Sequence, residues 1–427
     1  MRDFSVPGRS AAVAANGMVA TSAPMATLAG LDVLRAGGNA MDAAIAAVAM
    51  QSVVEPHSTG IGGDCFVLYS KQGALPVALN GSGRAPAAAT VEWFLERQIH
   101  QIHTQTAHAV TVPGAVDAWC LLNREHGTKP LAELLEPAAR AAEDGYRVTP
   151  RVAWDWGRNQ WKLQDPITAA VMLPGGKPPG VGDRMRNPAL AATLRLIGRE
   201  GREAFYAGPV MDDILGRLKE LGGLHEEEDF AAQRSNWVEP IHAPYRGCEV
   251  YELPPNGQGL AALMILRQLE GFALGDDSLS EADRLHILAE ATKNAYRVRD
   301  DFIADPSQAA VDVEGFLSDA WAEKARQVIR LDRAMPGPDW IAFTCRQPWA
   351  KIMIATHTRA SSNAKLAASL PRYMSPPAGP PVGPRQDATP RRDAAAAPTR
   401  PWRACGPPVP RRRRSPAPHR APAPSRR

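Results

Sequence analysis

The chain has 427 residues, of which 44% are hydrophobic and 22% are charged, values that exclude a wholly disordered chain and a protein made mainly of membrane spans. Charge is separated along the chain: residues 360–427 hold 14 Lys and Arg against two Asp, whereas the other 359 residues hold 35 basic and 43 acidic groups. The body is therefore mildly acidic, without the basic composition typical of a nucleic-acid-binding domain.

Two features bear on the cellular compartment. The N-terminal stretch MRDFSVPGRSAAVAANGMVAT contains no apolar run long enough for the core of a signal peptide, so we expect a cytoplasmic location. The five cysteines form no CxxC pair and are too widely spread for a disulfide framework or a zinc site, so we expect reduced thiols. They are Cys65, Cys120, Cys248, Cys345 and Cys405.

Two consecutive helices are predicted from Ala23 onward. Pro24 suits a first helical turn, where its missing N–H is not needed, and Gly37-Gly38 suits the end of that helix. Asn39 suits the N-cap of the next helix, AMDAAIAAVAMQSVV, which is rich in Ala on all sides. Because neighbouring backbones can approach such a helix closely, we expect it to lie inside the fold, and its apolar run is too short to span a bilayer.

Further elements follow in an order typical of an α/β protein. A glycine cluster at 60–63 leads into the β-branched and aromatic run Cys65–Tyr69, which predicts a strand. Residues 81–86 predict a turn, and residues 110–122 an extended segment broken at Pro113-Gly114 and then a helix. Later helices are predicted over residues 130–144, 187–200, 254–272 after an initial Pro/Gly loop, and 280–305 with Ser280 as N-cap.

The composition changes at about residue 336. From Met374 the chain is dominated by Pro, Arg and Ala, with few apolar side chains to offset the entropy of ordering, so we expect disorder there. The predicted organisation is a folded region over 1–335, a divergent junction over 336–373 and a disordered tail over 374–427.

One long motif and several shorter ones resemble a known family. The stretch AGLDVLRAGGNAMDAAIAAVAMQSVVEPHSTGIGGDCFVLY (29–69) is similar to the opening signature of the γ-glutamyltransferase large subunit. Later landmarks follow in register: APAAAT (85–90), VTVPGAVDAW (110–119), GGLHEEEDFAAQRSNWVEPI (222–241), PPNGQGLAALMILRQLEGF (254–272) and LHILAEATKNAYRVRDDFIADP (285–306).

The resemblance implies an N-terminal-nucleophile hydrolase fold, an αββα sandwich that would be incomplete in this chain. Such a protein cuts itself before a Thr to give a heterodimer. The freed α-amine, with a pKa of about 7.7–8.0 in model peptides, then activates the Thr hydroxyl to attack a γ-glutamyl amide such as glutathione. Backbone N–H groups of a Gly-Gly pair hold the oxyanion. The resemblance implies a small-molecule amide substrate and neither cofactor nor metal.

The nucleophile is the least clear part of the resemblance. If His357 in KIMIATHTRASSN (351–363) is aligned with the family's His, the nucleophile position falls on Ala355, which has no hydroxyl. Thr356 is the candidate catalytic residue instead, with Thr358 as another choice, although no apolar strand follows either. Nothing after residue 336 resembles the family's Ser-Ser substrate clamp or Gly-Gly oxyanion loop.

Arg84 is the candidate substrate-binding residue. Relatives use an Arg shortly before an Ala-Pro pair to bind the substrate α-carboxylate, and a guanidinium suits that role because of its bidentate fork. Here Arg84 directly precedes Ala85, whereas glutathione-processing members place two residues between them. That shift, with Asp64 and Cys65 after GIGG, resembles the oxamate amidohydrolase-like branch and leaves another small amide open as substrate.

Other residue types have simpler interpretations. We expect Glu226–Glu228 to be a solvated charge run rather than metal ligands, and Cys65 to be a small core residue rather than a nucleophile. Three hypotheses for the whole chain stay open. It is an autoprocessed amide hydrolase or acyltransferase, or a truncated or frame-shifted non-catalytic remnant, or a protein whose Arg-rich tail around Arg411–Arg414 binds nucleic acid, for which the acidic body gives little support.

Overall fold

The computed structural model describes residues 12–275 and 278–335, all within the first of two compact units, which spans residues 1–355. The predicted junction 336–373 and tail 374–427 lie outside the described residues, as does Thr356. Within the described ranges, no helix is both long enough and apolar enough to cross a membrane.

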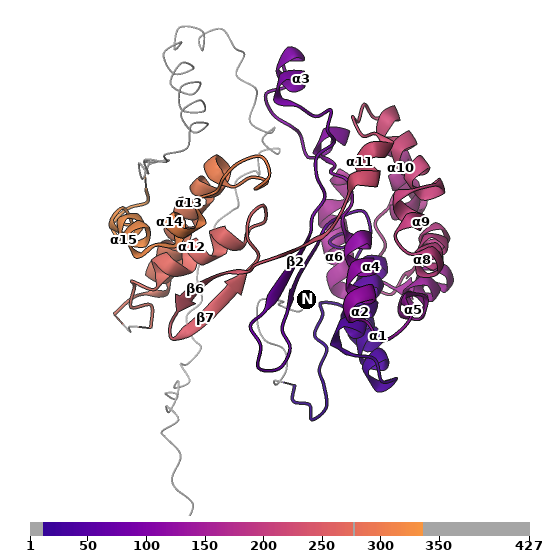
Figure 1. The fold of residues 1–427 in the computed structure, drawn as a ribbon, viewed down its shortest axis with the longest axis horizontal. Coiled ribbons are helices and arrows are strands. Elements are labelled where there is room, and N and C mark those ends of the chain that lie inside the picture. Colours follow the sequence, from indigo (N-terminus) through magenta and orange to yellow (C-terminus); the bar gives the residue numbers. More distant parts are fainter. Residues whose placement is uncertain (1–11, 276–277, 336–427) are drawn as a thin grey trace, which may run out of the picture. The chain divides into compact units, whose positions relative to one another are not determined.

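The first two helices form as the sequence predicts. Helix α1 (Pro24–Arg35) has Pro24 in its first turn, and α2 (Ala40–Val54) begins with a capping box. In that box Asp42 N–H donates to Asn39 Oδ1 (2.9 Å) and Asn39 N–H donates to Asp42 Oδ2 (3.0 Å), which satisfies two backbone donors that a helix start leaves free. Helix α2 is buried along most of its length and packs against its helical neighbours α1, α4 and α5 (Figure 1).

Further helices build the first half of the fold around one large apolar core. Helices α4, α5 and α8 confirm predicted ones, whereas the others shown here were not predicted. The helices between residues 90 and 235 are α3 (Val91–Glu96), α4 (Ala115–His126), α5 (Leu131–Asp144), α6 (Pro150–Asn159), α7 (Pro166–Met172), α8 (Pro188–Glu200), α9 (Glu203–Tyr206), α10 (Pro209–Glu220) and α11 (Glu227–Ala232), with 3₁₀ turns η1 (Ala107–Ala109), η2 (Gln160–Lys162) and η3 (Pro174–Gly176).

A three-stranded antiparallel sheet packs against these helices. Its order is β1 (Cys65–Tyr69), β2 (Val77–Gly81) and β5 (Asn236–Val238), of which only β1 was predicted. Val67 lies opposite Leu79, and Leu79 lies opposite Trp237. Because side chains alternate between the two faces of a strand, these three share the face that packs on the helical core. A separate pair, β3 (Tyr146–Arg147) and β4 (Arg184–Met185), joins the ends of α5 and α8.

The second half is a hairpin covered by helices. Strands β6 (Ile241–Tyr245) and β7 (Cys248–Glu252) pair antiparallel, and α12 (Gly259–Leu269) packs on them. The long helix α13 (Glu281–Phe302) starts at the predicted N-cap Ser280, and its Asn294 amide donates to buried Gln268 of α12 (2.9 Å). Helices α14 (Val313–Leu317) and α15 (Asp319–Gln327) complete the apolar core under α12.

Candidate functional site

The loop that carries Arg84 leaves β2 through glycines that lie against another backbone segment. A Cβ on Gly83 would lie 1.5 Å from the Val112 carbonyl oxygen, and a Cβ on Gly114 would lie 2.1 Å from the Gly81 carbonyl oxygen. Only glycine permits so close an approach. In addition, Val112 N–H donates to the Arg84 carbonyl (3.0 Å). The path of the loop is therefore fixed by backbone packing.

The Arg84 side chain is anchored at one end only. Its Nη1 donates to Ser307 Oγ (2.9 Å) and lies 3.4 Å from Asp305 Oδ2. Neither Nε nor Nη2 donates a hydrogen bond to any residue that the structure describes, and the side chain is 57% exposed. Two parallel N–H groups are thus held in a known orientation and stay open to a planar, two-oxygen acceptor such as a carboxylate.

Asp305 is ionised where it meets Arg84. Partial burial raises the pKa of this carboxyl group, but the Ser307 backbone and side-chain donors and the Arg84 charge together bring it below its usual range. Its Oδ1 accepts from Ser307 N–H (2.9 Å) and from Ser307 Oγ–H (2.8 Å). The carboxylate and the hydroxyl therefore form one rigid anchor for the guanidinium.

Neutral polar groups surround the start of the same loop. Asn80 Nδ2 donates to Asn256 Oδ1 (3.0 Å), and Asn256 Nδ2 donates to Ser82 Oγ (3.2 Å). Ser82 Oγ in turn donates to Asn80 Oδ1 (2.7 Å). These amide and hydroxyl groups come from β2, its following loop and the segment before α12, and they give the site hydrogen-bonding capacity without charge.

A buried ion pair supports the loop from the side of α4. Asp117 is 5% exposed, and its Oδ1 accepts from Arg202 Nε (2.7 Å) while its Oδ2 accepts from Ser235 N–H (2.6 Å). Arg202 Nη2 also donates to the Gln233 carbonyl (2.7 Å), and Gln233 Nε2 donates to the Ser82 carbonyl (3.1 Å). These hydrogen bonds connect the buried Asp117–Arg202 pair to the loop that carries Arg84.

A second support comes from the start of α11. Asp229 Oδ1 accepts from Ala87 N–H (2.9 Å), at the far end of the loop. Beside it lies His225, 1% exposed, whose two ring nitrogens find no hydrogen-bonding partner within the described ranges. Burial lowers the pKa of His225, and the nearby His108 lowers it further. The Val110 backbone, which lies near the ring without forming a well-aligned hydrogen bond, and the Asp229 charge oppose this only in part.

The structure places the other predicted residues as follows. Cys65 is half-buried on β1, and burial together with the Asp64 charge raises the pKa of its thiol to about 11, which fits the core interpretation. Glu226–Glu228 are exposed at the start of α11, and Glu226 pairs with Lys219 (2.9 Å), as expected for a solvated charge run. No three His, Cys, Asp or Glu side chains among the described residues are grouped to hold a metal ion.

Sequence reasoning proposed Arg84 as a binding residue but did not predict the residues that surround it. Asp305 and Ser307 follow α13 and lie in or just beyond the landmark that ends at residue 306, yet nothing in their spacing links them to Arg84, 223 positions away from Ser307. Asn80 and Asn256 each precede a Gly, which marks a turn but not a shared site.

Comparison with known proteins gives consistent matches. The sequence model of a family described as Gamma-glutamyltranspeptidase matches residues 26–370. The glutathione hydrolase-like YwrD proenzyme of Bacillus subtilis is 35% identical over 314 residues, which are 73% of this chain and 60% of the relative. An acylase ACY 1 proenzyme from a Pseudomonas species is 36% identical over 329 residues, 74% of this chain and 59% of the relative. The chain thus spans about 60% of the length of these relatives.

Two further matches bear on the fold and on the branch. The crystal structure of cephalosporin acylase from Bacillus halodurans matches with a TM-score of 0.70 and 42% identity, over 77% of this chain and 62% of that one. An oxamate amidohydrolase proenzyme from Klebsiella pneumoniae is 33% identical over 72% of this chain and 58% of its own length. The predicted N-terminal-nucleophile hydrolase fold class is confirmed, and the oxamate branch is among the relatives.

Proposed function

Because the chain belongs to the gamma-glutamyltranspeptidase family, we propose that it supplies the large-subunit part of an amide hydrolase or acyltransferase whose substrate carries a carboxylate. The observation that carries this proposal is the half-anchored guanidinium of Arg84. Asp305 and Ser307 hold Nη1, which leaves the Nε and Nη2 edge for the substrate.

The proposed substrate is a small amide. Glutathione and oxamate appear in the names of two relatives, and both molecules combine an amide bond with a carboxylate. Arg84 would bind the carboxylate, and the Asn80, Ser82 and Asn256 groups would donate to or accept from the amide portion. Glutathione and a smaller amide differ in how far the amide carbon lies from the carboxylate.

The proposed reaction is acyl transfer through a Thr hydroxyl. A hydroxyl attacks an amide only when a base takes its proton, and cleavage between Ala355 and Thr356 would create that base as the new α-amine of Thr356. The proenzyme names of the relatives and the family match, which reaches residue 370, support such a cut and a cleaved heterodimer. Thr356 itself lies outside the described residues.

Autoprocessing is tested on the full chain. Purified protein should separate on a denaturing gel into two fragments, and intact-mass measurement should place the cut directly before Thr356. The variant Thr356→Ala should stay uncut, whereas the matched control Thr358→Ala should be cut like the wild type. An uncut wild-type chain, or cutting that persists in Thr356→Ala, would contradict this assignment of the nucleophile.

Substrate turnover is tested separately. The cut protein should release p-nitroaniline from γ-glutamyl-p-nitroanilide or ammonia from oxamate, and the ratio of the two rates should identify the branch. An uncut chain that hydrolyses neither amide would instead support the non-catalytic remnant. Binding of glutarate, a dicarboxylate without a scissile bond, reports on Arg84 whether or not the chain is cut.

A further inference from the structure

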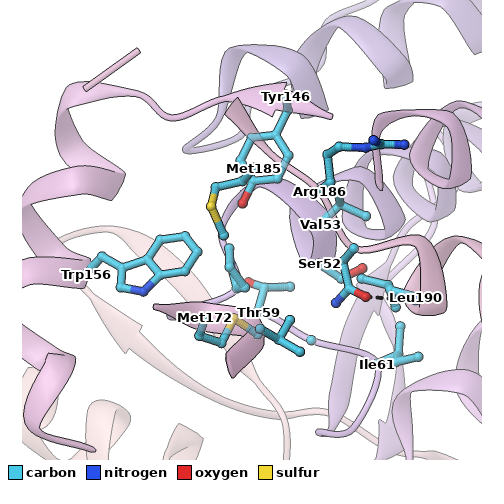
Figure 2. Close-up of a pocket in the computed structure, with 14 residues that line it drawn as sticks. Ser52, Val53, Thr59, Ile61, Tyr146, Trp156, Met172, Met185, Arg186 and Leu190 are labelled. Atoms are coloured by element: carbon cyan, nitrogen blue, oxygen red, sulfur yellow. Dashed lines mark hydrogen bonds between the residues drawn. The ribbon is translucent and has the colours of Figure 1, made fainter. Parts of the chain in front are cut away.

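A cavity of about 220 Å³ lies away from the Arg84 loop, and none of its lining residues belongs to that loop. Its walls come from the end of α2, the segment that follows α2, the β3–β4 pair, and helices α6, α7 and α8. The lining is mostly apolar: Val53, Ile61, Trp156, Met172, Met185 and Leu190 contribute to it (Figure 2). An apolar cavity of about 150 Å³ is already large enough to hold benzene.

Tyr146 places a hydroxyl group in this apolar wall. Its side chain is 6% exposed, and Figure 2 shows its oxygen directed toward the space between Met185, Trp156 and Thr59. The hydroxyl makes no hydrogen bond with any residue the structure describes, and burial alone raises its pKa. Because this hydroxyl faces the cavity and is not among the fully buried unpaired atoms, its donor is accessible to a hydrogen-bond acceptor that enters the cavity.

The charge of the cavity lining restricts which ligands can bind there. Among the described residues that line the cavity, Arg186 is the one with a charged side chain, and its Nε donates to the Glu143 carbonyl (2.7 Å). Figure 2 shows its guanidinium directed away from Tyr146. An ionised ligand would therefore lose hydration without gaining a counter-charge, which strongly disfavours it. Trp156 and the Met185 thioether instead favour contact with an aromatic ring.

We propose that the cavity binds a small, uncharged molecule with one aromatic ring and a carbonyl oxygen that accepts a hydrogen bond from Tyr146. The ring lies among Trp156, Met172 and Met185, and the carbonyl satisfies the unpaired hydroxyl. This site is independent of the amide-hydrolysing function proposed above, because it shares no residue with the Arg84 loop.

The test uses the full chain and two probes of similar shape. Acetophenone has a ring and a carbonyl, whereas ethylbenzene has the ring and no acceptor. Their dissociation constants are measured by calorimetry on wild type, Tyr146→Phe and the control Tyr251→Phe, whose ring stacks on His242 of β6 outside the cavity. The preference for acetophenone over ethylbenzene should fall about fivefold in Tyr146→Phe and stay unchanged in Tyr251→Phe.

A second measurement locates the probe without any mutation. With methyl-labelled Met, acetophenone should shift the resonances of Met172 and Met185 and leave that of Met264, which lies on α12 in a separate apolar core, unchanged. The proposal is overturned if wild type binds neither probe, as a cavity that holds only water would predict. It is also overturned if Tyr146→Phe keeps the full preference, or if binding leaves both cavity methionines unchanged.

Discussion

Two buried polar clusters hold the Arg84 loop, and they differ in how completely their groups are paired. Both carboxylate oxygens of Asp117 accept hydrogen bonds, from Arg202 and from Ser235. Neither ring nitrogen of His225 has a partner in the part of the chain that the structure describes. A fully paired network is rigid, whereas an unpaired buried group responds to protonation. The paired cluster around Asp117 should therefore contribute more to the free energy of unfolding. The unpaired cluster around His225 should determine how that free energy depends on pH.

Breaking the paired cluster should have the largest effect. Asp117→Asn removes the charge that faces Arg202, whose side chain is only 17% exposed, so the free energy of unfolding should fall by about 3 kcal/mol. Urea denaturation of the two proteins measures the difference. The expected loss comes from removing the buried partner of Arg202, which leaves only the exposed Glu203 beside its charge, rather than from any change in volume.

A matched variant separates this effect from ordinary surface charge. Glu203 is the other carboxylate near Arg202, but it is 73% exposed, so Glu203→Gln should lower the free energy of unfolding by less than about 1 kcal/mol. Equal losses in Asp117→Asn and Glu203→Gln would show that burial of the pair does not matter, and the comparison of the two clusters would fail.

The fold could be predicted from the sequence where local signals decide it. Pro24, Asn39 and Ser280 mark helix starts through contacts within one turn, and α1, α2 and α13 begin there. The short strand β5 (Asn236–Val238) could not be found this way, because its three residues carry no clear alternation and are ordered by pairing with β2. The hairpin β6–β7 was missed for a related reason, since Pro244 within β6 argues against a strand.

The site was predictable only in part. The Ala-Pro motif pointed to Arg84, but the residues that orient it are distant in sequence and carry no motif of their own. Ser307 and Asn256 reach the loop across more than 170 positions, through tertiary packing that a single sequence does not encode locally. The buried His225 gave no signal either, because a lone His in a charged stretch is ordinary.

The two clusters hold the loop of Arg84, and substituting Arg84 tests whether its guanidinium binds a carboxylate. Arg84→Lys keeps the charge but has one ammonium group, which cannot contact Ser307 and also offer two parallel donors to a carboxylate. Glutarate should bind about tenfold more weakly to this variant in calorimetry, since one charge-assisted hydrogen bond is lost. The control Arg97→Lys, directly after α3 and with its guanidinium carbon 4.1 Å from the Trp93 ring centroid, should bind glutarate like the wild type. Unchanged binding in Arg84→Lys would show that the fork is not used.

Protonation of the unpaired cluster should have the smallest effect. The folded-state pKa of His225 lies below its unfolded value of about 6.5, so the unfolded chain takes up a proton first as the pH falls. The free energy of unfolding should therefore decrease as the pH is lowered through about 6.5, with a slope of at most about 1.4 kcal/mol per pH unit. The charge of Asp229 raises the pKa of His225 and so weakens this pH dependence, whereas the neighbouring His108 lowers the pKa and strengthens it.

Comparing two His variants assigns that slope to one residue. His225→Phe removes the titrating group from a site that is already 99% covered, so its stability should depend less steeply on pH between about 7 and 5.5 than that of the wild type. His103→Gln, at an exposed position, should keep the wild-type slope. Thermal unfolding at several pH values measures both slopes. If the profiles of His225→Phe and the wild type are parallel, the pKa of His225 is the same in the folded and unfolded states. The unpaired cluster would then be as insensitive to pH as the paired one.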